Sequence, residues 1–450
     1  MKHFMKKLVF VLAVTLSVVG LRQNVFAEKL ITVDETTFPD KVFREAVVTA
    51  WNIAEPEDWG TKHDEGTDVI QIDAELIKSV SAYDTSSSGA VANLKGIELL
   101  PNLESLYLNN YTGGKINLSK NTNLTNVNIT SKKYVLSPND FASLPKLVSL
   151  GMYDKVASTV DVSKLKKLKD IRISSKTGAK KVDVSKCSKL QDLSLYTNSM
   201  TSVNLGSSKE LTKVHIQGAK KLTSVNVTKL TNLTYLVVRD CNISKIDISK
   251  NKKLESFAVN GNKKVKSVSF KNNQNLTWIN LGYTGVTKLD TSKMKKLMAI
   301  EVYNTKISSL NLKKNTKMYS VDVANTLIKS LDISNCKKLN YINIAGSKIK
   351  SLNMKNQKEM YGLTYTYGQK ITFPSKITRD YCWIDIEGVK KGSSIVVPAF
   401  CKGYKFSADK EYSLTYKNNK IITSKKTKKK YAYASFTKGN KSISFSIKYK

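Results

Sequence analysis

The chain has 450 residues, with 74 Lys and Arg against 36 Asp and Glu, and a formal net charge of +38. A field of this sign attracts polyanions and is screened by salt. Beyond the N-terminus no stretch reaches 18 apolar residues, which excludes a membrane-spanning helix from the remainder of the sequence.

The first 27 residues have the pattern of an export signal. Lys2, Lys6 and Lys7 supply positive charge, Leu8 to Leu21 is an apolar run too short for a comfortable membrane span, and small residues allow cleavage after Ala27. We therefore expect residues 1–27 to be a signal peptide, and the alternative is an uncleaved anchor. Cleavage removes four basic residues and no acid, which leaves the mature chain at +34.

Residues 28–98 do not repeat and are expected to form an N-terminal cap, because a solenoid needs its first core layer covered. Phe38-Pro39-Asp40 opens a predicted amphipathic helix, and Glu55 to Asp68 is predicted to be an acidic loop. Asp73 is expected to cap a second short helix over Ala74 to Val80. One side of the first helix carries Val42, Phe43, Ala46, Val47, Ala50 and Trp51.

Residues 99–370 repeat with a period of about 21 residues. The repeat opens with Leu-x-x-Φ-x-Φ, where Φ is aliphatic, and a second phrase, Φ-Asp/Asn-Φ, trails it at the same period. One copy cannot bury its own apolar face, whereas stacked copies share a continuous core. Thirteen openings follow one another at intervals of 21 to 23 residues: Leu103, Leu124, Leu147, Leu168, Leu190, Leu211, Leu233, Leu254, Leu276, Leu297, Met318, Leu339 and Met360.

This period predicts a β-rich repeat solenoid of about thirteen coils. A coil so short has no room for a full helix on its return path, so we expect one strand from the first phrase and a short strand-like or 3₁₀ segment from the second. Neighbouring coils then pair in parallel at about 4.8 Å.

Residues 371–450 are expected to form a small C-terminal β domain. The period stops near Phe373-Pro374, and the segments that follow are rich in Tyr, Ser, Thr and Val and alternate in polarity. This pattern is typical of antiparallel strands joined by turns, and such a domain would also cover the last open edge of the solenoid.

The five cysteines show no metal-binding spacing. Cys187 and Cys336 occupy the same slot of the second phrase, and Cys241 follows a predicted strand, so all three are expected to be small buried residues. Cys382 and Cys401 lie in the C-terminal segment, where the sequence leaves open whether they pair.

The repeat resembles that of secreted bacterial leucine-rich repeat proteins. Leu94 to Leu108 is similar to the first repeat of internalin-like proteins, and Ile246 to Leu254 is similar to repeats of Gram-positive gut-bacterial surface proteins. Phe38 to Arg44 resembles the cap that precedes such arrays, and Ile421 to Tyr449 is faintly similar to bacterial Ig-like domains. The resemblance implies the fold of the repeat region and leaves the ligand open.

No motif supports catalysis or a bound metal or cofactor. In that group an EF-hand-like loop often follows the cap, but His63 to Asp68 lacks the Asp-x-Asp-x-Asp-Gly ligand pattern. Two histidines, His63 and His215, remain after the signal, and they lie far apart in the sequence. Nucleophile elbows and phosphate loops are absent from the sequence, so we expect neither an enzyme nor a cofactor.

Positions 3, 5 and 7 of the opening phrase are predicted to face outward on the concave side of the sheet, because strand side chains alternate. Seven of these 39 positions carry an aromatic residue, and three others carry a basic one: Arg172, Lys213 and Arg239. The aromatic residues are interpreted either as anchors for a partner or as strand residues that pack on their neighbours. They are Tyr107, Tyr153, Tyr196, Tyr235, Trp278, Tyr303 and Tyr341.

Lysine recurs at a different place, four residues after the start of the second phrase. Stacked coils would align these lysines in a column at one edge, next to a column of Asp and Asn. The column is interpreted either as a ridge for a linear polyanion or as ordinary turn and edge chemistry. The predicted ridge consists of Lys120, Lys164, Lys186, Lys229, Lys250, Lys293 and Lys314.

The sequence thus predicts a secreted or envelope-associated binding and adhesion protein of a Gram-positive bacterium, retained non-covalently at the wall or released. We expect a protein or glycan partner on the concave face and anionic wall polymers or sulfated glycans at the basic edge. Outside a cell, nucleic acid is not an expected partner. The alternatives are that lysine keeps an elongated solenoid soluble, and that the protein is a structural scaffold of the wall or matrix.

Overall fold

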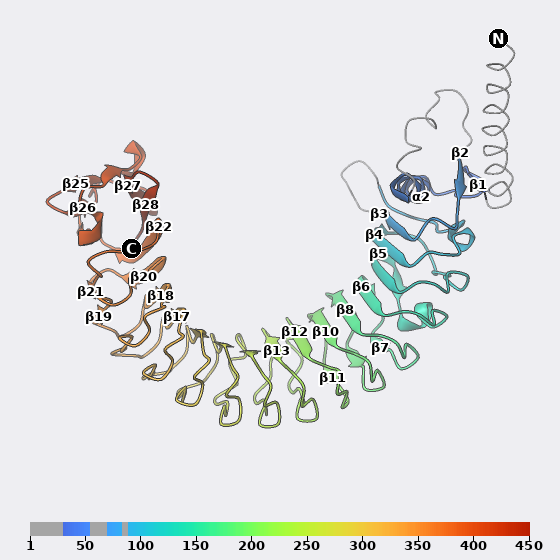
Figure 1. Cartoon of the computed structure of the whole chain (residues 1–450), viewed down its shortest axis with the longest axis horizontal. Helices are drawn as coiled ribbons and strands as arrows, with labels where there is room; N and C mark the ends of the chain where they lie inside the picture. The colour runs from blue at the N-terminus through green and yellow to red at the C-terminus, as the bar shows by residue number, and fades with distance from the viewer. Residues whose placement is uncertain (1–29, 55–69, 83–88) are drawn as a thin grey trace, which may run out of the picture. The chain divides into compact units, whose positions relative to one another are not determined.

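A computed structural model describes residues 30–54, 70–82 and 89–450 (Figure 1). The expected signal peptide and the acidic loop over Glu55 to Asp68 lie outside these residues. The chain divides into two compact units, residues 1–204 and 205–450. Within the described part of the chain, no helix combines the length and apolar character needed to cross a membrane.

The first unit begins with the cap. Strand β1 (Leu30–Val33) pairs antiparallel with β2 (Ile70–Asp73), and helix α2 (Lys41–Ala54) follows β1. The predicted amphipathic face is present, since Phe43, Ala46, Val47 and Trp51 are buried.

Asp40 starts helix α2 and fixes it to the next segment. Its Oδ1 accepts a hydrogen bond from the Phe43 amide at 2.9 Å, and its Oδ2 accepts from the amides of Ala92 and Asn93. The carboxylate thus satisfies a free N–H at the helix start and ties the helix to a segment about 50 residues later in the sequence.

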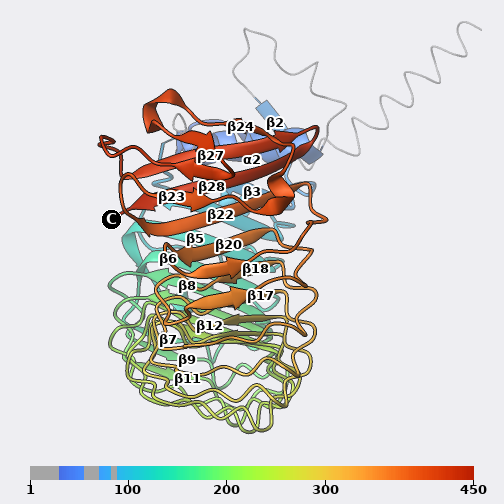
Figure 2. The same cartoon turned by 90° about the vertical axis from the view of Figure 1, so that its left-hand side faces the viewer.

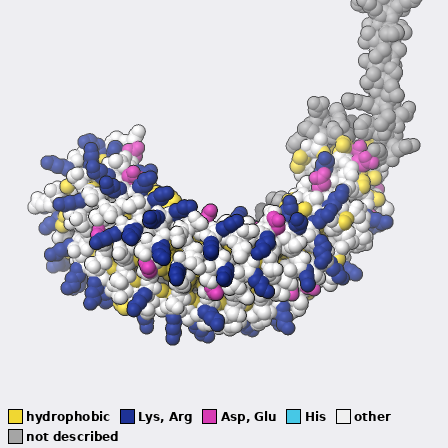
Figure 3. Space-filling model, turned by 60° about the horizontal axis from the view of Figure 1, so that its bottom comes forward, with side chains coloured by type: hydrophobic (Ala, Val, Ile, Leu, Met, Phe, Trp, Pro, Cys, Tyr) yellow, Lys and Arg dark blue, Asp and Glu magenta, His cyan; other side chains and the backbone are white. Residues whose placement is uncertain are grey.

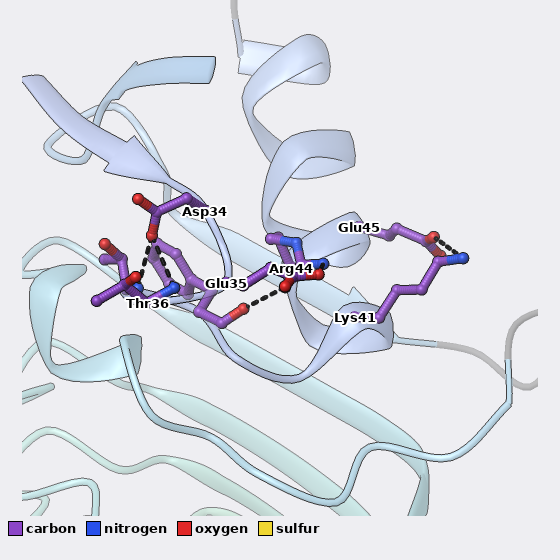
Figure 4. Close-up of polar contacts among 8 residues, drawn as sticks. Asp34, Glu35, Thr36, Lys41, Arg44 and Glu45 are labelled. Carbon is purple, nitrogen blue, oxygen red and sulfur yellow. Dashed lines mark hydrogen bonds and ion pairs between the residues drawn. The ribbon is translucent and has the colours of Figure 1, made fainter. Parts of the chain in front are cut away.

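Arg44 and Asp34 hold the turn that leads into the helix (Figure 4). The Arg44 guanidinium donates to the Phe38 carbonyl at 2.7 Å and reaches Glu35 Oε1 at 3.3 Å. Asp34 Oδ1 accepts from the amides of Thr36 and Thr37, which lowers the pKa of that carboxyl.

The predicted second helix over Ala74 to Val80 is wrong. Asp73 does cap a turn, by accepting from the Glu75 amide at 2.9 Å, but Ser79–Ala82 is strand β3 and pairs in parallel with β4. Ile77, Val80 and Ala82 are buried at the spacing of the repeat's opening phrase, so this segment forms the first rung of the sheet. Backbone hydrogen bonds to β4 outweigh the local preference of this segment for a helix.

Parallel pairing runs through the first unit from β3 to β10 in register. Val127 faces Leu106 on one side and Leu150 on the other, which keeps the apolar residues of successive coils in columns. A smaller parallel sheet, in the order β11, β9, β7, forms from the second phrases. The remaining elements are η2 (Ile97–Leu99), β4 (Ser105–Tyr111), β5 (Asn126–Leu136), η3 (Pro138–Phe141), β6 (Ser149–Val156), β7 (Thr159–Asp161), β8 (Asp170–Ser175), β9 (Lys181–Asp183), β10 (Asp192–Thr197) and β11 (Ser202–Asn204).

The second unit continues the same architecture. Its strands pair in parallel from β12 to β18 and then through β20 to β22, and they lie along one side of the coils (Figure 1). Second phrases form a strand pair only at β19 and β21. The elements are β12 (Lys213–Gln217), β13 (Tyr235–Arg239), β14 (Ser256–Ala258), β15 (Trp278–Asn280), β16 (Ala299–Glu301), β17 (Ser320–Asp322), β18 (Tyr341–Asn343), β19 (Ser351–Asn353), β20 (Gly362–Thr366), β21 (Lys370–Thr372) and β22 (Tyr381–Val389).

All thirteen residues that open the repeat are at most 1% exposed. Burying a Leu or Met side chain stabilises a fold by about 1.5–3 kcal/mol, so each coil depends on the coils beside it for this contribution. The molecule is therefore a parallel β-solenoid of about thirteen coils, as the period predicts.

The sheet continues beyond residue 371, where the sequence analysis ends the repeat. Strand β22 pairs in parallel with β20, and β28 pairs in parallel with β22, after which β27 and β24 add antiparallel (Figure 2). The C-terminal segment is thus only partly antiparallel, and its first strand is a further rung of the solenoid. A separate antiparallel sheet has the order β23, β26, β25. The elements are β23 (Ser394–Val396), η4 (Ala399–Cys401), β24 (Lys405–Ser407), η5 (Lys410–Tyr412), β25 (Thr415–Lys417), β26 (Lys420–Ile422), β27 (Tyr431–Lys438) and β28 (Lys441–Tyr449).

Buried side-chain donors join several coils to the coil before them. Asn273 Nδ2 donates to the carbonyls of Ile248 and Asn251, at 3.1 and 2.8 Å, and Asn251 Nδ2 donates in the same way to Val227 and Leu230. The thiol of Cys187 contacts the Val162 carbonyl at 3.3 Å from the same slot. We call this set the amide ladder; its amide members are Asn121, Asn251, Asn273, Asn315 and Gln357.

All five cysteines are buried free thiols in this structure, including Cys382 and Cys401. Burial raises the pKa of the Cys187 thiol to about 11 and that of Cys336 to about 11. These thiols therefore stay protonated near neutral pH, which suits packing and weak donation rather than nucleophilic chemistry.

The amide ladder predicts a stability contrast between two adjacent residues. Asn273→Ala removes two buried hydrogen bonds to carbonyls that each keep one backbone donor, so we expect the free energy of unfolding to fall by about 1–3 kcal/mol. The exposed neighbour Asn272 donates to the Ser249 carbonyl at 3.0 Å, and Asn272→Ala should cost under about 1 kcal/mol. Chemical denaturation of both variants measures the difference.

Asn273→Cys supplies the control, because cysteine already occupies this slot at Cys187 and Cys336. It should restore part of the stability that Asn273→Ala loses. Equal stability of the alanine and cysteine variants would contradict a stabilising role for a donor at this position.

Candidate functional site

The expected aromatic stripe lies on the outward face of the sheet in both units. In the first unit Tyr107, Tyr153 and Tyr196 are half-buried. Tyr153 and Arg172 line a small cleft of about 280 Å³, which Asp170 and Asp192 also border.

Tyr153 is held in place by its neighbours. Its hydroxyl lies 3.3 Å from Asn128 Oδ1, to which it donates, and its ring lies against Gly151, where a Cβ would come within 2.8 Å of ring carbon Cε2. Burial raises the pKa of the Tyr153 hydroxyl, while the charge of Arg172 and its hydrogen bond oppose that rise. Tyr153 and Arg172, which the sequence singled out separately, thus form one contact.

The second unit carries Tyr235, Trp278, Tyr303 and Tyr341 on the same face, all half-buried. The strand register sets small residues beside two of these rings: Ser256 and Ala299 beside Trp278, and Ser320 and Gly362 beside Tyr341. Tyr303 lies over Gly282, where a Cβ would come within 2.5 Å of the ring. The predicted face residues therefore alternate with small ones and do not form a continuous stack of rings.

Trp278 belongs to a polar network that fixes its orientation. The indole Nε1 donates to Glu301 Oε1 at 2.9 Å, and Asn280 Nδ2 donates to Glu301 Oε2 at 2.6 Å. Asn280 Oδ1 in turn accepts from the Gly282 amide at 2.9 Å. One carboxylate thus connects the aromatic anchor to the backbone below Tyr303.

Asp322 stands next to this network on the following strand. Burial raises its pKa to about 6, against the lowering effect of hydrogen bonds from the Ala324 amide and the Asn343 side chain, while the charge of Glu301 adds to the rise. The same turn is made by Asn in other coils, since Asn280 and Asn343 Oδ1 accept from the amides of Gly282 and Ala345.

The Arg239 guanidinium already forms a hydrogen bond within the sheet face. Its Nη2 donates to Gln217 Oε1 at 2.6 Å, and the side chain is half-buried. Arg172 is exposed beside Tyr153. Of the two arginines predicted as binding residues, Arg172 is the more accessible.

The lysines of the predicted ridge lie away from this face. All seven are exposed, and within the described part of the chain none of them forms an ion pair. Lys and Arg side chains are spread over the turn side of the coils (Figure 3).

The neighbouring Asp and Asn column is a set of turns. Asp247 Oδ1 accepts from the Ser249 amide at 2.9 Å, and Asp290 and Asp332 repeat the contact with Ser292 and Ser334. These backbone hydrogen bonds lower the pKa of the Asp247, Asp290 and Asp332 carboxyls. The column therefore shapes the turn that presents each lysine.

Several aromatic residues near the C-terminal end of the sheet escaped the sequence analysis. Trp383 faces Gly362 in the register, and Tyr341 contacts it at 5.5 Å between ring centroids. The sequence does contain the repeat pattern here, because Tyr381 follows Met360 by one period and Ile384 and Ile386 occupy the aliphatic positions of the opening phrase. The coil was missed because it begins with Tyr where the other coils have Leu or Met.

The described residues contain no group of three or more His, Cys, Asp or Glu side chains placed to hold a metal ion. The face consists of half-buried rings, amides and carboxylates on strands, and this arrangement suits binding of a surface.

The short period, the buried leucine columns and the parallel one-strand coils define a leucine-rich repeat solenoid. No protein-family model matches the chain, and no curated protein sequence matches it. The functional domain of InlJ from Listeria monocytogenes, described as including a cysteine ladder, is similar in structure at 18% identity and a TM-score of 0.56. The match covers 94% of this chain and 99% of that one.

Two further structures align less closely. An internalin, InlF, from Listeria monocytogenes has a TM-score of 0.44 at 18% identity over 77% of this chain and 92% of its own. A leucine-rich repeat protein of Leptospira interrogans has a TM-score of 0.47 at 16% identity over 66% of this chain and 86% of its own. At these identities the likeness concerns the fold.

The raised pKa of Asp322 predicts a pH-dependent stability. The Asp322 carboxyl has a folded-state pKa of about 6, above its ordinary value of 3.8. Its protonated form therefore stabilises the folded state below pH 4, and this contribution to the free energy of unfolding is lost as the pH rises through 6. Asp322→Asn removes this loss, so its free energy of unfolding should exceed that of the wild type by about 2 kcal/mol at pH 7.5 and match it at pH 4. Chemical denaturation of the variant and the wild type at both pH values measures this difference. A difference in the free energy of unfolding that is the same at pH 4 and pH 7.5 would contradict the prediction.

Proposed function

We propose that the protein is an exported, non-catalytic recognition protein that holds a protein or glycan partner on the outward face of its leucine-rich repeat sheet. The observation that carries the proposal is the set of half-buried aromatic rings on a face that is poor in lysine, in a chain with a net charge of +38. Solvation alone does not explain why lysine is depleted from that face.

The Trp278 network supports the proposal. The indole N–H of Trp278 donates to Glu301, which also accepts from Asn280, so the ring has one fixed orientation. Rings held in one orientation lose little entropy on binding, which is a property of interface anchors. Trp278 has the small neighbours Ser256 and Ala299 in the register, whereas Gly282 is covered by the ring of Tyr303.

Export and retention outside the cell belong to the same proposal. They rest on the pattern of residues 1–27 and on the high positive charge. The alternative function is a structural scaffold of the wall or matrix, for which the aromatic residues would have only a packing role.

Replacing Tyr235, Trp278 and Tyr303 together by alanine separates recognition from scaffolding. We expect binding to arrayed glycans or extracellular proteins to weaken by about a hundredfold or more, because aromatic anchors carry much of the energy of an interface. Surface plasmon resonance measures the loss against each ligand that the wild type binds.

The matched control is Tyr319→Ala, since Tyr319 is 44% exposed and lies outside the face positions. It should bind as the wild type does. Unchanged binding by the triple variant, with a normal circular dichroism spectrum, would favour the scaffold.

We further propose that the lysine column binds linear anionic polymers, because its members are exposed, recur at the coil period and lack ion-pair partners among the described residues. Replacing four lysines of the second unit by glutamine should weaken binding to heparin or teichoic acid by about tenfold at low salt and reduce its salt dependence. The four are Lys229, Lys250, Lys293 and Lys314.

A charge-matched control distinguishes a ridge from bulk charge. Four exposed lysines on another column change the net charge equally when replaced by glutamine: Lys245, Lys266, Lys288 and Lys329. An equal loss of affinity in both quadruple variants, or wild-type binding that does not weaken with salt, would argue against the ridge.

A further inference from the structure

A cleft of about 720 Å³ lies within the second unit, where β22, β27 and β28 extend the solenoid sheet. This volume falls in the range of small-ligand sites. Its position is outside the expected aromatic stripe, and its walls combine rings with hydroxyls and carboxylates. The residues used below are Tyr361, Tyr381, Trp383, Asp385, Tyr433 and Ser446.

The aromatic walls of the cleft are positioned by contacts outside it. Trp383 lies over Gly362, where a Cβ would come within 2.6 Å of the indole, and Tyr341 contacts its ring at 5.5 Å. Tyr361 and Tyr381 pack on each other at 5.6 Å, and both are more than 40% exposed. On β27, which β28 separates from β22 in the same sheet, Tyr433 is 50% exposed and its ring contacts Tyr412 at 5.5 Å.

The polar groups between the rings are oxygen atoms. Asp385 is half-buried, and the side chains of Ser446 and Thr364 hydrogen-bond to its carboxylate. Asp409 is exposed at the rim, and Ser435 and Ser444 add hydroxyls. None of the described residues that line the cleft is Lys, Arg or His.

This chemistry selects among ligands. Exposed ring faces pack against the C–H face of a pyranose, while carboxylates and serine hydroxyls accept and donate hydrogen bonds at its rim. Two carboxylates without a lining cation disfavour an anionic ligand. A proline-rich peptide also packs on aromatic grooves, but it offers few N–H donors to the carboxylates.

We propose that this cleft binds a neutral oligosaccharide, with Trp383 and Tyr433 as stacking platforms and Asp385 as a hydrogen-bond acceptor for sugar hydroxyls. The site adjoins the sheet-face partner site proposed above through the contact between Tyr341 and Trp383, and goes beyond it. The chain then has chemically distinct surfaces, of which the cleft is the one suited to an uncharged glycan.

Isothermal titration of the mature chain with cellohexaose, chitohexaose and maltohexaose tests the proposal. At least one of these neutral sugars should bind, with an affinity that is the same at about 0.05 M and about 0.5 M salt. Trp383→Ala and Tyr433→Ala should each lower that affinity by about tenfold or more. Tyr433 is largely exposed, so its variant keeps the test valid even if Trp383→Ala perturbs folding.

The matched control is Tyr431→Ala, because Tyr431 is 38% exposed on the same strand and does not line the cleft. It should bind the sugar as the wild type does. The alanine triple variant at Tyr235, Trp278 and Tyr303 should also keep sugar binding, so failure of the cleft and failure of the sheet-face site are distinguishable. Absence of binding to all three sugars, a fall in affinity with salt, no effect of Tyr433→Ala, or binding of a decaproline peptide instead would each overturn the proposal.

Discussion

The donation of buried side-chain N–H groups to the carbonyls of the preceding coil is the interaction on which the remaining structure depends. A coil of about 21 residues turns tightly, and the buried carbonyls of its turns each accept one backbone N–H and keep a second lone pair for another donor. Asn251 and Asn273 satisfy two such carbonyls each, from one slot in successive coils. Because the donor of one coil must meet the acceptors of the coil before it, the ladder opposes any slip of register between coils.

This fixed register makes the surface a set of columns. Apolar positions such as Leu106, Val127 and Leu150 face one another across strands, so outward positions also align. One set of columns carries rings and carboxylates, and another carries lysine. The turn that presents each lysine is built by the Asp or Asn three residues before it, as Asp247 does for Lys250. A single repeat sequence thereby keeps charges of one sign away from the aromatic face.

Separation of the columns has an electrostatic consequence. Asp322 and Glu301 lie on neighbouring strands in a chain with a large positive charge, and burial still raises the pKa of Asp322 to about 6. Desolvation and the adjacent carboxylate outweigh the distant lysines, because exposed charges beyond about 10 Å are screened by salt. The sheet face and the cleft near Trp383 are accordingly local acidic and aromatic environments on a basic protein.

The sequence by itself determined the period, the parallel β-solenoid, the helix after Phe38 and which residues of each coil are buried, because burial at fixed spacing leaves a direct trace in the order of residues. It also indicated which positions face outward. It failed where a partner strand outweighs local preference. Ala74 to Val80 has the pattern of a short helix, yet Ser79–Ala82 becomes the first rung, and the further rung at Tyr381 to Ile386 begins with Tyr where the other coils have Leu or Met. Only the tertiary structure placed Trp383, Asp385 and Tyr433 around one cleft, since β22, β28 and β27 meet through pairings that span up to about 60 residues and mix parallel with antiparallel strands. Contacts that recur in every coil leave a periodic pattern in the sequence. Contacts that occur at one place, such as those among β22, β27 and β28, leave no such pattern and are seen only in the folded chain.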